Sequence, residues 1–345
     1  MLLKTPKFWT EKNLISVSLL PLSLIYFFGT FLVKIFTKTE KISKPVICVG
    51  NLIAGGSGKT PTAIAIGKIL QEMSVNFAFL SRGYMGDGLA FLMLKKHEKN
   101  NVKEVGDEPL LLLDTGPTFV AKNRLFGAKQ IDVIKNFDLI LLDDGMQNSS
   151  LHHDLTILVV DGKIGFGNEF LIPAGPMRET LQTGLKKADL VVVIGAATGE
   201  LLQKLTGKKI VRAKIIPTNL QKFLGKKLIA FCGLAYPQKF FSFLSDCGLE
   251  VSDSLSFADH HHYEISELEN LCKIAEEKNS TLVTTKKDWV KFPESFQKKI
   301  SYLDIELEFE NKEIVITYLR QLQFYFLRRM SGAPHSQGTP IPNQF

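Results

Sequence analysis

Apolar runs of five or six residues alternate with longer helix-like stretches through the first two thirds of the chain. The runs are almost continuous in hydrophobic residues, which is typical of strands that a parallel sheet buries on both faces. The stretches between them would form helices that cover the sheet. The predicted strands are residues 45–49, 76–81, 117–121, 138–143, 155–160 and 189–194. The pattern therefore predicts an α/β fold with a parallel sheet covered by helices.

A second, smaller α/β unit is predicted in the last third of the chain. Its apolar runs are "KLIAFCGL" (227–234), "STLVTTKKD" (280–288) and "YLDIELEF" (302–309), and a helix is predicted near 237–247. The segment before this unit is extended and more basic, which indicates a connection. The predicted division is an amino-terminal segment 1–44, a core 45–207, a linker 208–220, a carboxyl-terminal lobe 221–330 and a polar, proline-rich tail 331–345 that we expect to be disordered.

An uncharged stretch lies near the amino terminus. Residues 13–33 form 21 consecutive positions without a charge, and about 20 apolar residues can span a bilayer. Pro21 and Gly29 interrupt the stretch, and lysines flank both ends, which favours a hydrophobic helix lying in one anionic membrane interface. A buried core helix and a true membrane span are the alternatives. A cleavable signal peptide is not expected, because no small-residue cleavage site follows.

Composition narrows the classes of partner. The chain carries 42 basic and 35 acidic residues, a formal net charge of +7, which suits an anionic partner or a membrane surface. Nucleic acid is not the expected partner, because no recognition motif accompanies the charge. The four cysteines (Cys48, Cys232, Cys247 and Cys272) are far apart in the sequence. Their spacing fits neither a zinc site nor a disulfide framework, and it indicates a reducing compartment.

A glycine-rich loop, "GNLIAGGSGKTP" at residues 50–61, follows the first strand and precedes a helical stretch. Such a loop turns its backbone N–H groups towards phosphate, while Lys59 would reach the terminal phosphates and Thr60 would hold Mg²⁺. Ile53 stands where the usual pattern has its first glycine. A turn without a nucleotide is the alternative. The predicted nucleotide-binding residues are Ile53, Ala54, Gly55, Gly56, Ser57, Gly58, Lys59 and Thr60.

Three further segments offer chemistry. "DLILLDDGMQ" (138–147) ends a strand on two carboxylates, which could hold Mg²⁺ or cap a turn. "EVGDEP" (104–109) could supply a catalytic carboxylate or only a helix cap. "FADHHHY" (257–263) suggests metal, but adjacent histidines do not easily converge on one ion. One histidine working with a carboxylate is the favoured interpretation.

The ordered strings "VGNLIAGGSGKTP", "SRGY", "VGDEP", "DDGMQ", "IPAGPMRE", "FADHH" and "TTKKD" resemble the tetraacyldisaccharide 4'-kinase family of lipid A synthesis. The resemblance covers about residues 45–292, and the hydrophobic amino terminus is also similar to that family. It implies a P-loop kinase that uses ATP and Mg²⁺. The implied reaction moves the γ-phosphate to the 4'-hydroxyl of tetraacyldisaccharide 1-phosphate, forming lipid IVA. The implied partners are this lipid A precursor and the anionic cytoplasmic face of the bacterial inner membrane, contacted peripherally or by an embedded helix.

The resemblance also implies roles for individual residues. The catalytic aspartate and its partner histidine match Asp107 and His260, with Lys59 on the phosphates. The residues implied at Mg²⁺ are Thr60, Asp143, Asp144 and Glu179, and those implied near substrate phosphates or the acceptor are Arg82, Arg124, Gln147 and Arg178. Asn148 departs from the histidine that is common in the family after "DDGxQ".

Two other classes share parts of this pattern. A P-loop ATPase or GTPase of metal-cofactor assembly would have the same loop and acidic strand end, but it would hydrolyse nucleotide without a lipid. A nucleotide-regulated membrane-binding module would bind ATP and not depend on Asp107.

Overall fold

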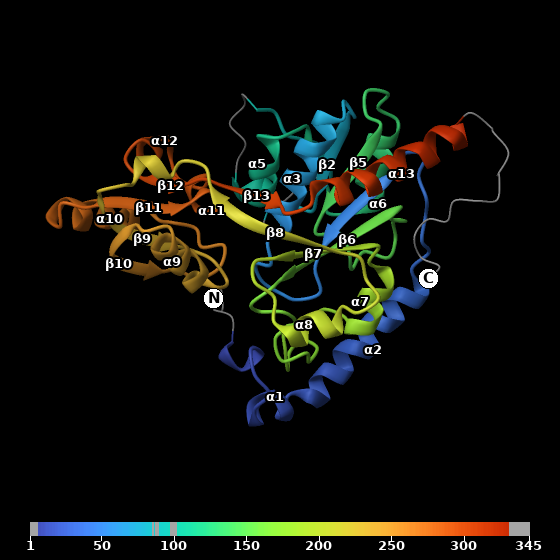
Figure 1. Cartoon of the computed structure of the whole chain (residues 1–345), viewed down its shortest axis with the longest axis horizontal. Helices are drawn as coiled ribbons and strands as arrows, with labels where there is room; N and C mark the ends of the chain where they lie inside the picture. Colours follow the sequence, from blue (N-terminus) through green and yellow to red (C-terminus); the bar gives the residue numbers. More distant parts are fainter. Residues whose placement is uncertain (1–5, 85, 87–89, 97–101, 331–345) are drawn as a thin grey trace.

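Two sheets carry the fold (Figure 1). The computed structural model describes residues 6–84, 86, 90–96 and 102–330. The larger sheet has nine strands in the order β13-β8-β7-β6-β1-β5-β2-β4-β3, and the smaller has four in the order β10-β9-β11-β12. The described strands are β1 (Val46–Gly50), β2 (Phe77–Ser81), β3 (Leu92–Met93), β4 (Thr118–Val120), β5 (Leu139–Asp143), β6 (Leu155–Asp161), β7 (Leu190–Ile194), β8 (Ile210–Pro217), β9 (Lys227–Cys232), β10 (Glu250–Ser256), β11 (Thr281–Thr285), β12 (Ser301–Leu303) and β13 (Ile305–Phe309).

Helices pack around both sheets, as the alternating pattern predicts. Most are short, and several begin at a side-chain cap such as Asn123 or Thr180. The described helices are η1 (Lys7–Trp9), α1 (Leu14–Ser18), α2 (Leu20–Phe36), α3 (Lys59–Glu72), α4 (Val102–Val105), α5 (Glu108–Leu113), α6 (Arg124–Asp132), α7 (Leu181–Lys187), α8 (Gly199–Lys204), η2 (Leu220–Lys222), α9 (Pro237–Asp246), α10 (Ile265–Glu277), α11 (Lys286–Trp289), α12 (Glu294–Gln297) and α13 (Lys312–Met330).

The larger sheet is parallel except at its two ends, where β3 pairs antiparallel with β4 and β13 pairs antiparallel with β8. Its central strands are buried on both faces, which explains why their sequences are continuously apolar. One core contains Ile66 and Ile69 of α3, and the core on the other face contains Ala128 and Ile131 of α6. The predicted α/β class is confirmed.

Strand register places the candidate chemistry at one edge of this sheet. Val49 of β1 lies opposite Asp143 of β5, so the loop after β1 and the carboxylates that end β5 are neighbours. Ligands bind beyond the carboxyl ends of parallel strands in such sheets. The register therefore assembles a site from segments about 90 residues apart in the sequence.

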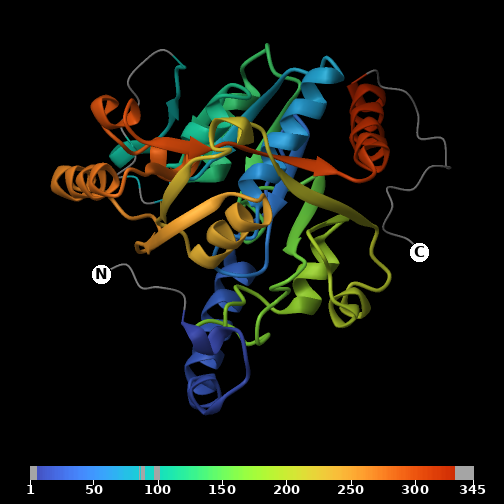
Figure 2. The same cartoon turned by 60° about the vertical axis from the view of Figure 1, so that its left-hand side comes forward.

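The prediction of a linker at 208–220 is wrong. Most of it is β8, which pairs with β7 and β13 inside the larger sheet. The predicted carboxyl-terminal lobe also differs, because β13 and α13 return to the larger sheet, where Leu307, Val315 and Leu319 join its core. The run 302–309 therefore divides between two sheets, which a continuous apolar pattern cannot reveal. The smaller sheet lies to one side of the larger one in Figure 1 and comes forward when the molecule is turned (Figure 2).

The amino-terminal stretch forms α1 and α2, which extend from the body at the bottom of the view (Figure 1). One side of α2 is fixed by polar contacts. Ser23 is buried and its Oγ donates to the Leu171 carbonyl, and the Tyr26 hydroxyl donates to the Arg178 carbonyl. The other side exposes apolar side chains, including Leu24, Ile25, Phe28, Phe31, Leu32, Val33 and Phe36. In the described part of the chain, no helix combines the length and hydropathy needed to cross a bilayer. The predicted tail at 331–345 lies outside the described residues.

Candidate active site

The glycine-rich loop lies between β1 and α3, as predicted. Gly58 has φ +87°, a conformation that favours glycine, and a Cβ there would lie 2.4 Å from Cδ1 of Ile194, so that side chain would have to move. Asn51 stiffens the loop, because its amide donates to the Ser57 hydroxyl and the Ile53 carbonyl. α3 begins at Lys59 and directs its N-terminal dipole at the loop.

The structure explains the isoleucine that replaces the usual first glycine. Ile53 is buried and forms an isolated β-bridge with Met177. Its neighbour Ala54 donates its N–H to the Pro176 carbonyl. The first half of the loop is therefore fixed against the "GPMR" segment, where an apolar side chain packs. Only the second half keeps the glycines that can face phosphate.

The carboxylates at the end of β5 point to different partners. Asp143 is buried, and its Oδ2 accepts a hydrogen bond of 2.9 Å from the Thr60 hydroxyl. Asp144 has φ +56°, a left-handed conformation that is strained for an aspartate, and its carboxylate lies 3.7 Å from Lys59 Nζ. Adjacent strand-end residues thus face the helix start and the lysine separately.

Burial and neighbouring charges shift the pKa values of Asp143 and Asp144 in opposite directions. Burial, with the nearby charges of Glu108 and Asp144, raises the pKa of Asp143 to about 7. Burial would also raise the pKa of Asp144, but Lys59 and Arg178 outweigh it and lower the pKa to about 2.

A polar network continues from Asp144 to the substrate candidates. Arg178 Nη1 donates to both Asp144 oxygens at 2.8 and 3.0 Å, and it also reaches the Gln147 side chain. Arg124 is buried and donates to the Asp144 carbonyl at 2.6 Å. Arg82 is exposed after β2, close enough that its charge lowers the pKa of Arg124, after burial itself.

Glu179 lies apart from the two strand-end carboxylates. Its Oε2 is bonded by Lys187 at 2.7 Å and Lys34 at 3.0 Å, and its Oε1 accepts from Gln147 at 3.1 Å. Burial would raise the pKa of Glu179, but the two lysines outweigh it and lower the pKa. Both carboxylate oxygens therefore already have cationic or amide donors.

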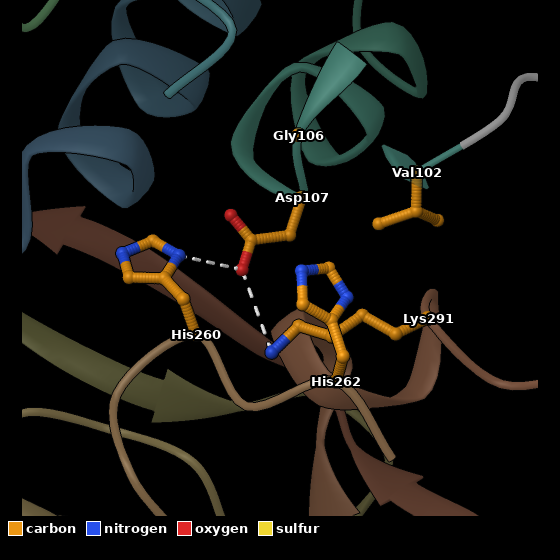
Figure 3. A pocket seen from close by; sticks show the side chains of 6 residues that line it. All are labelled: Val102, Gly106, Asp107, His260, His262 and Lys291. Carbon is orange, nitrogen blue, oxygen red and sulfur yellow. Dashed lines mark hydrogen bonds and ion pairs between the residues drawn. The ribbon is translucent and has the colours of Figure 1, made fainter. Parts of the chain in front are cut away.

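Asp107, just before α5, contacts His260, which lies in the loop between β10 and α10 (Figure 3). His260 Nδ1 lies 2.9 Å from Asp107 Oδ2, and Asp107 is only 4% exposed. Asp107 precedes α5, but its side chain makes no capping hydrogen bond. Its other oxygen, Oδ1, is buried without a hydrogen-bond partner among the described residues. His260 has φ +56°, so its backbone is strained at the residue whose side chain contacts Asp107.

Two lysines surround this pair from α11 and its end. Lys291 Nζ lies 3.5 Å and Lys287 Nζ 4.0 Å from Asp107 Oδ2. Burial opposes ionisation of Asp107, but Lys287, His260 and Lys291 outweigh it and hold its pKa well below the usual range. Asp107 is therefore a carboxylate at neutral pH.

The other two histidines of the run have different surroundings. His261 Nε2 lies 2.9 Å from Glu267 and its ring stacks on Phe257. His262 lines the small cavity beside Asp107 and Lys291 (Figure 3). No cluster of three or more His, Cys, Asp or Glu side chains suited to a metal occurs within the described residues. The three histidines thus have separate partners.

Comparison with known proteins decides the family. Residues 15–323 match the family model described as tetraacyldisaccharide-1-P 4'-kinase. The chain belongs to this family. It is 38% identical over 314 residues to tetraacyldisaccharide 4'-kinase of Rickettsia canadensis (strain McKiel), covering 90% of this chain and 94% of that protein. It is also 38% identical over 315 residues to the protein of the same name from Paramagnetospirillum magneticum (strain ATCC 700264 / AMB-1), covering 89% and 95%.

A solved member of the family has the same architecture. The crystal structure of the "apo" form of LpxK from Aquifex aeolicus in complex with ATP has a TM-score of 0.70 and 28% identity to this chain. The similarity covers 91% of this chain and 99% of that one. The expected family and P-loop kinase fold are confirmed.

The donor set at the end of β5 fits the Mg²⁺ that a kinase of this family implies. Thr60 Oγ1 and the Asp143 carboxylate are hard oxygen donors in contact, and Asp143 Oδ1 is buried without a hydrogen-bond partner among the described residues. Magnesium commonly takes one or two carboxylates and completes its coordination with nucleotide phosphates and water. Glu179 does not fit as well, because lysines and Gln147 occupy its oxygens.

Several polar residues of the site have no place in the sequence-based assignment. They are Lys34 and Lys187 at Glu179, Lys287 and Lys291 at Asp107, and Lys239, which bonds the Gly56 carbonyl and Asp161. Lys287 lies within "TTKKD", a string that carries the family resemblance, so this motif could have indicated Lys287 as a residue of the site. The other four are surface-type lysines whose sequence context does not distinguish them.

Proposed function

We propose that this chain transfers the γ-phosphate of ATP to the 4'-hydroxyl of tetraacyldisaccharide 1-phosphate. Family membership supports the reaction, and the single observation that carries it is the buried Asp107, with one oxygen bonded by His260 and the other without a hydrogen-bond partner among the described residues. A carboxylate with one free oxygen can accept a hydroxyl proton, as a kinase base does. An ATPase of cofactor assembly would not need such an acceptor site.

The proposed roles follow from the contacts. Gly55, Gly58 and the N-terminus of α3 would hold the phosphates through backbone N–H groups. Lys59, buried and 3.7 Å from Asp144, would neutralise charge on the terminal phosphates. Thr60 and Asp143 would hold Mg²⁺, which supplies charge neutralisation when it is bound. The remaining loop residues would line the nucleotide.

Proton removal would fall to Asp107. Because Asp107 is a carboxylate, His260 Nδ1 would donate to Oδ2, which would leave Oδ1 for the sugar hydroxyl. The low pKa makes Asp107 a weak base. A weak base suffices because the transition state of phosphoryl transfer is loose, and the hydroxyl becomes acidic late in the transfer. Arg124, Arg178 and Gln147 would orient substrate phosphates or the acceptor around Asp144, with Arg82 at the exposed edge.

We further propose that α1 and α2 contact the anionic cytoplasmic face of the bacterial inner membrane, where the lipid substrate resides. The outer side of α2 exposes Ile25, Phe28 and Leu32, while Lys12 and Lys38 flank the helices. An apolar face with basic flanks is typical of an interfacial helix. The inner side touches Arg178 and Glu179, so the lipid surface and the site would be neighbours.

The deciding experiment incubates the purified full-length protein with γ-labelled ATP and the tetraacyldisaccharide 1-phosphate. We expect label in the lipid, and no transfer by Lys59→Ala with the fold intact by circular dichroism, because a point charge at the phosphates is lost. ATP hydrolysis that is independent of the lipid would favour the cofactor-assembly class. ATP binding without any turnover would favour a membrane-binding module. Near-normal transfer by Lys59→Ala would contradict the kinase mechanism.

A further inference from the structure

Lys287 touches the far side of the histidine that bonds Asp107. Its Nζ lies 3.2 Å from His260 Nε2 and 3.6 Å from Asp259 Oδ1. The side chain is 18% exposed. His260 Nδ1 therefore faces the Asp107 carboxylate, while Nε2 faces the Lys287 ammonium at 3.2 Å and, farther away, Asp259 Oδ1 at 3.9 Å.

Charge on Lys287 is maintained by its surroundings. Burial opposes the ammonium form, but the charges of Asp107, Glu108 and Asp259 outweigh burial and raise the pKa of Lys287 above its usual value. An ammonium has three N–H donors and no acceptor. It can contact His260 Nε2 favourably only if that nitrogen presents a lone pair.

This contact favours one tautomer of the ring. If Nε2 accepts from Lys287, the single proton of the neutral imidazole is on Nδ1, where it donates to Asp107 Oδ2 at 2.9 Å. The opposite tautomer would place the Nδ1 lone pair against a carboxylate oxygen. A doubly protonated ring would place an N–H against the ammonium.

We propose that Lys287 is a positioning residue that fixes His260 as the neutral Nδ1–H tautomer, and so keeps Asp107 Oδ1 free for the acceptor hydroxyl. This inference rests on the proposed function of the Asp107–His260 pair. An outer partner that fixes a histidine tautomer is a common device of metal and catalytic sites.

The local fold aims Lys287 at this position. Thr285 caps α11 by accepting from the Asp288 backbone N–H, and Asp288 in turn bonds the Gly233 backbone N–H and Lys291. Lys291 follows Lys287 by four residues and lies on the same side, 3.5 Å from Asp107. Lys286 points elsewhere, towards Asp114 and Asp304, which makes it a matched control in the same helix.

The first test observes the ring directly. Histidine ring nitrogens of the full-length protein, labelled with ¹⁵N, are recorded by NMR at neutral pH, and His260 is assigned by the signal lost in His260→Gln. The wild type and Lys286→Met should show protonated Nδ1 and unprotonated Nε2. Lys287→Met should populate the Nε2–H or the doubly protonated form. A wild-type ring protonated on Nε2, or an unchanged tautomer in Lys287→Met, would overturn the proposal.

The second test measures turnover. Lys287→Met should lower kcat for lipid phosphorylation by about 10-fold to 100-fold, as loss of an outer partner does, while KM for ATP changes by less than about threefold because the phosphate loop is untouched. Lys287→Arg should recover most of the rate, and Lys286→Met should keep it. A rise in KM for ATP with unchanged kcat would contradict the positioning role. If the wild type phosphorylates no lipid, the proposed function fails, whereas the NMR result still decides the tautomer.

Discussion

Two residues at this site have an unusual backbone conformation. Asp144 and His260 both have φ +56°, a conformation that costs about 1 kcal/mol or more for a residue with a side chain. Each directs its side chain at a charged partner, Arg178 or Asp107. The strain is therefore found where the side chains converge, which is typical of functional sites.

The Asp107–His260 pair yields the most discriminating prediction at this scale. Asp107→Ala and His260→Ala should each slow lipid phosphorylation by about 100-fold or more, since positioned proton transfer contributes that much. ATP affinity should barely change. Because members of a catalytic unit are not additive, the double variant should be scarcely slower than the worse single one. Rates are measured with labelled ATP and affinity by calorimetry.

His261→Ala is the control for that pair, because His261 bonds Glu267 instead of Asp107. It should transfer phosphate at close to the normal rate. Additive losses in the double variant would argue that Asp107 and His260 act separately. Loss of folding in Asp107→Ala would favour a mainly structural role for this carboxylate.

His153 predicts a pH dependence of stability. Burial, then the charges of His152, Lys187 and Arg124, lower its pKa from 6.5 to about 4. Because the folded pKa is below the unfolded value, the neutral ring contributes stability above pH 6.5 that is lost as the pH falls towards 4. The loss between pH 7 and 4 is about 3 kcal/mol.

His153→Phe cannot bind the proton, so its free energy of unfolding should fall by about 3 kcal/mol less than that of the wild type over the same interval. Urea titrations at several pH values measure this difference. His152→Gln, at the exposed neighbour, should keep most of the wild-type loss, because burial is the larger cause of the low pKa of His153 and the charge of His152 only adds to it. Parallel curves for His153→Phe and the wild type would refute the assignment.

At the scale of elements, α2 has a polar side that contacts the protein and an apolar side that does not. Its polar side bonds the segment of Arg178 and Glu179 through Tyr26 and Lys34, and its apolar side is exposed. Replacing Ile25, Phe28 and Leu32 with serine should weaken binding to anionic vesicles by about 1000-fold, because each buried aliphatic or aromatic side chain contributes about 1.5 kcal/mol or more. The fold should remain intact. Sedimentation with vesicles measures the binding.

A matched triple variant changes exposed apolar residues outside this helix. Phe126, Val133 and Leu224 are also exposed, and serine at these three positions should leave vesicle binding unchanged. If both triple variants bind as the wild type does, the membrane contact lies elsewhere on the protein.

At the scale of the whole molecule, the smaller sheet is attached to the phosphate loop. Lys239 of α9 donates to the Gly56 carbonyl at 3.0 Å and to Asp161 at the end of β6 at 2.7 Å. The Tyr236 ring lies so close to Gly55 that a Cβ there would be 3.0 Å from it. Lys239 therefore links the nucleotide loop, the larger sheet and the smaller unit.

We predict that Lys239→Met and Asp161→Asn each raise KM for ATP by about threefold to tenfold, because a partly exposed ion pair contributes about 1 kcal/mol. A double-mutant cycle should show coupling, with the double variant no worse than either single one. Lys214→Met removes an exposed ion pair with Glu308 on the same large sheet, and it should have no effect on KM. Fully additive effects of Lys239→Met and Asp161→Asn would contradict the link.

The sequence alone determined the class of fold and the order of its parts. Continuous apolar runs predicted the buried strands β2, β4, β5, β6 and β7 within a residue or two, because burial on both faces requires such runs. The glycine-rich loop and the strand-end carboxylates were also predicted from local patterns. The pairing of Asp107 with His260 was implied by family resemblance, since 153 residues separate them.

Only the tertiary structure decided how distant segments combine. The pairing of β8 with β13, and hence the return of the chain to the larger sheet, depends on hydrogen bonds between strands whose apolar patterns are the same in either sheet. The tertiary structure also determined which lysines lie at Asp107, at Glu179 and at the phosphate loop. A lysine has the same helical spacing and polarity whether it faces water or a buried carboxylate. Its role depends on which charge the fold places within about 4 Å of it.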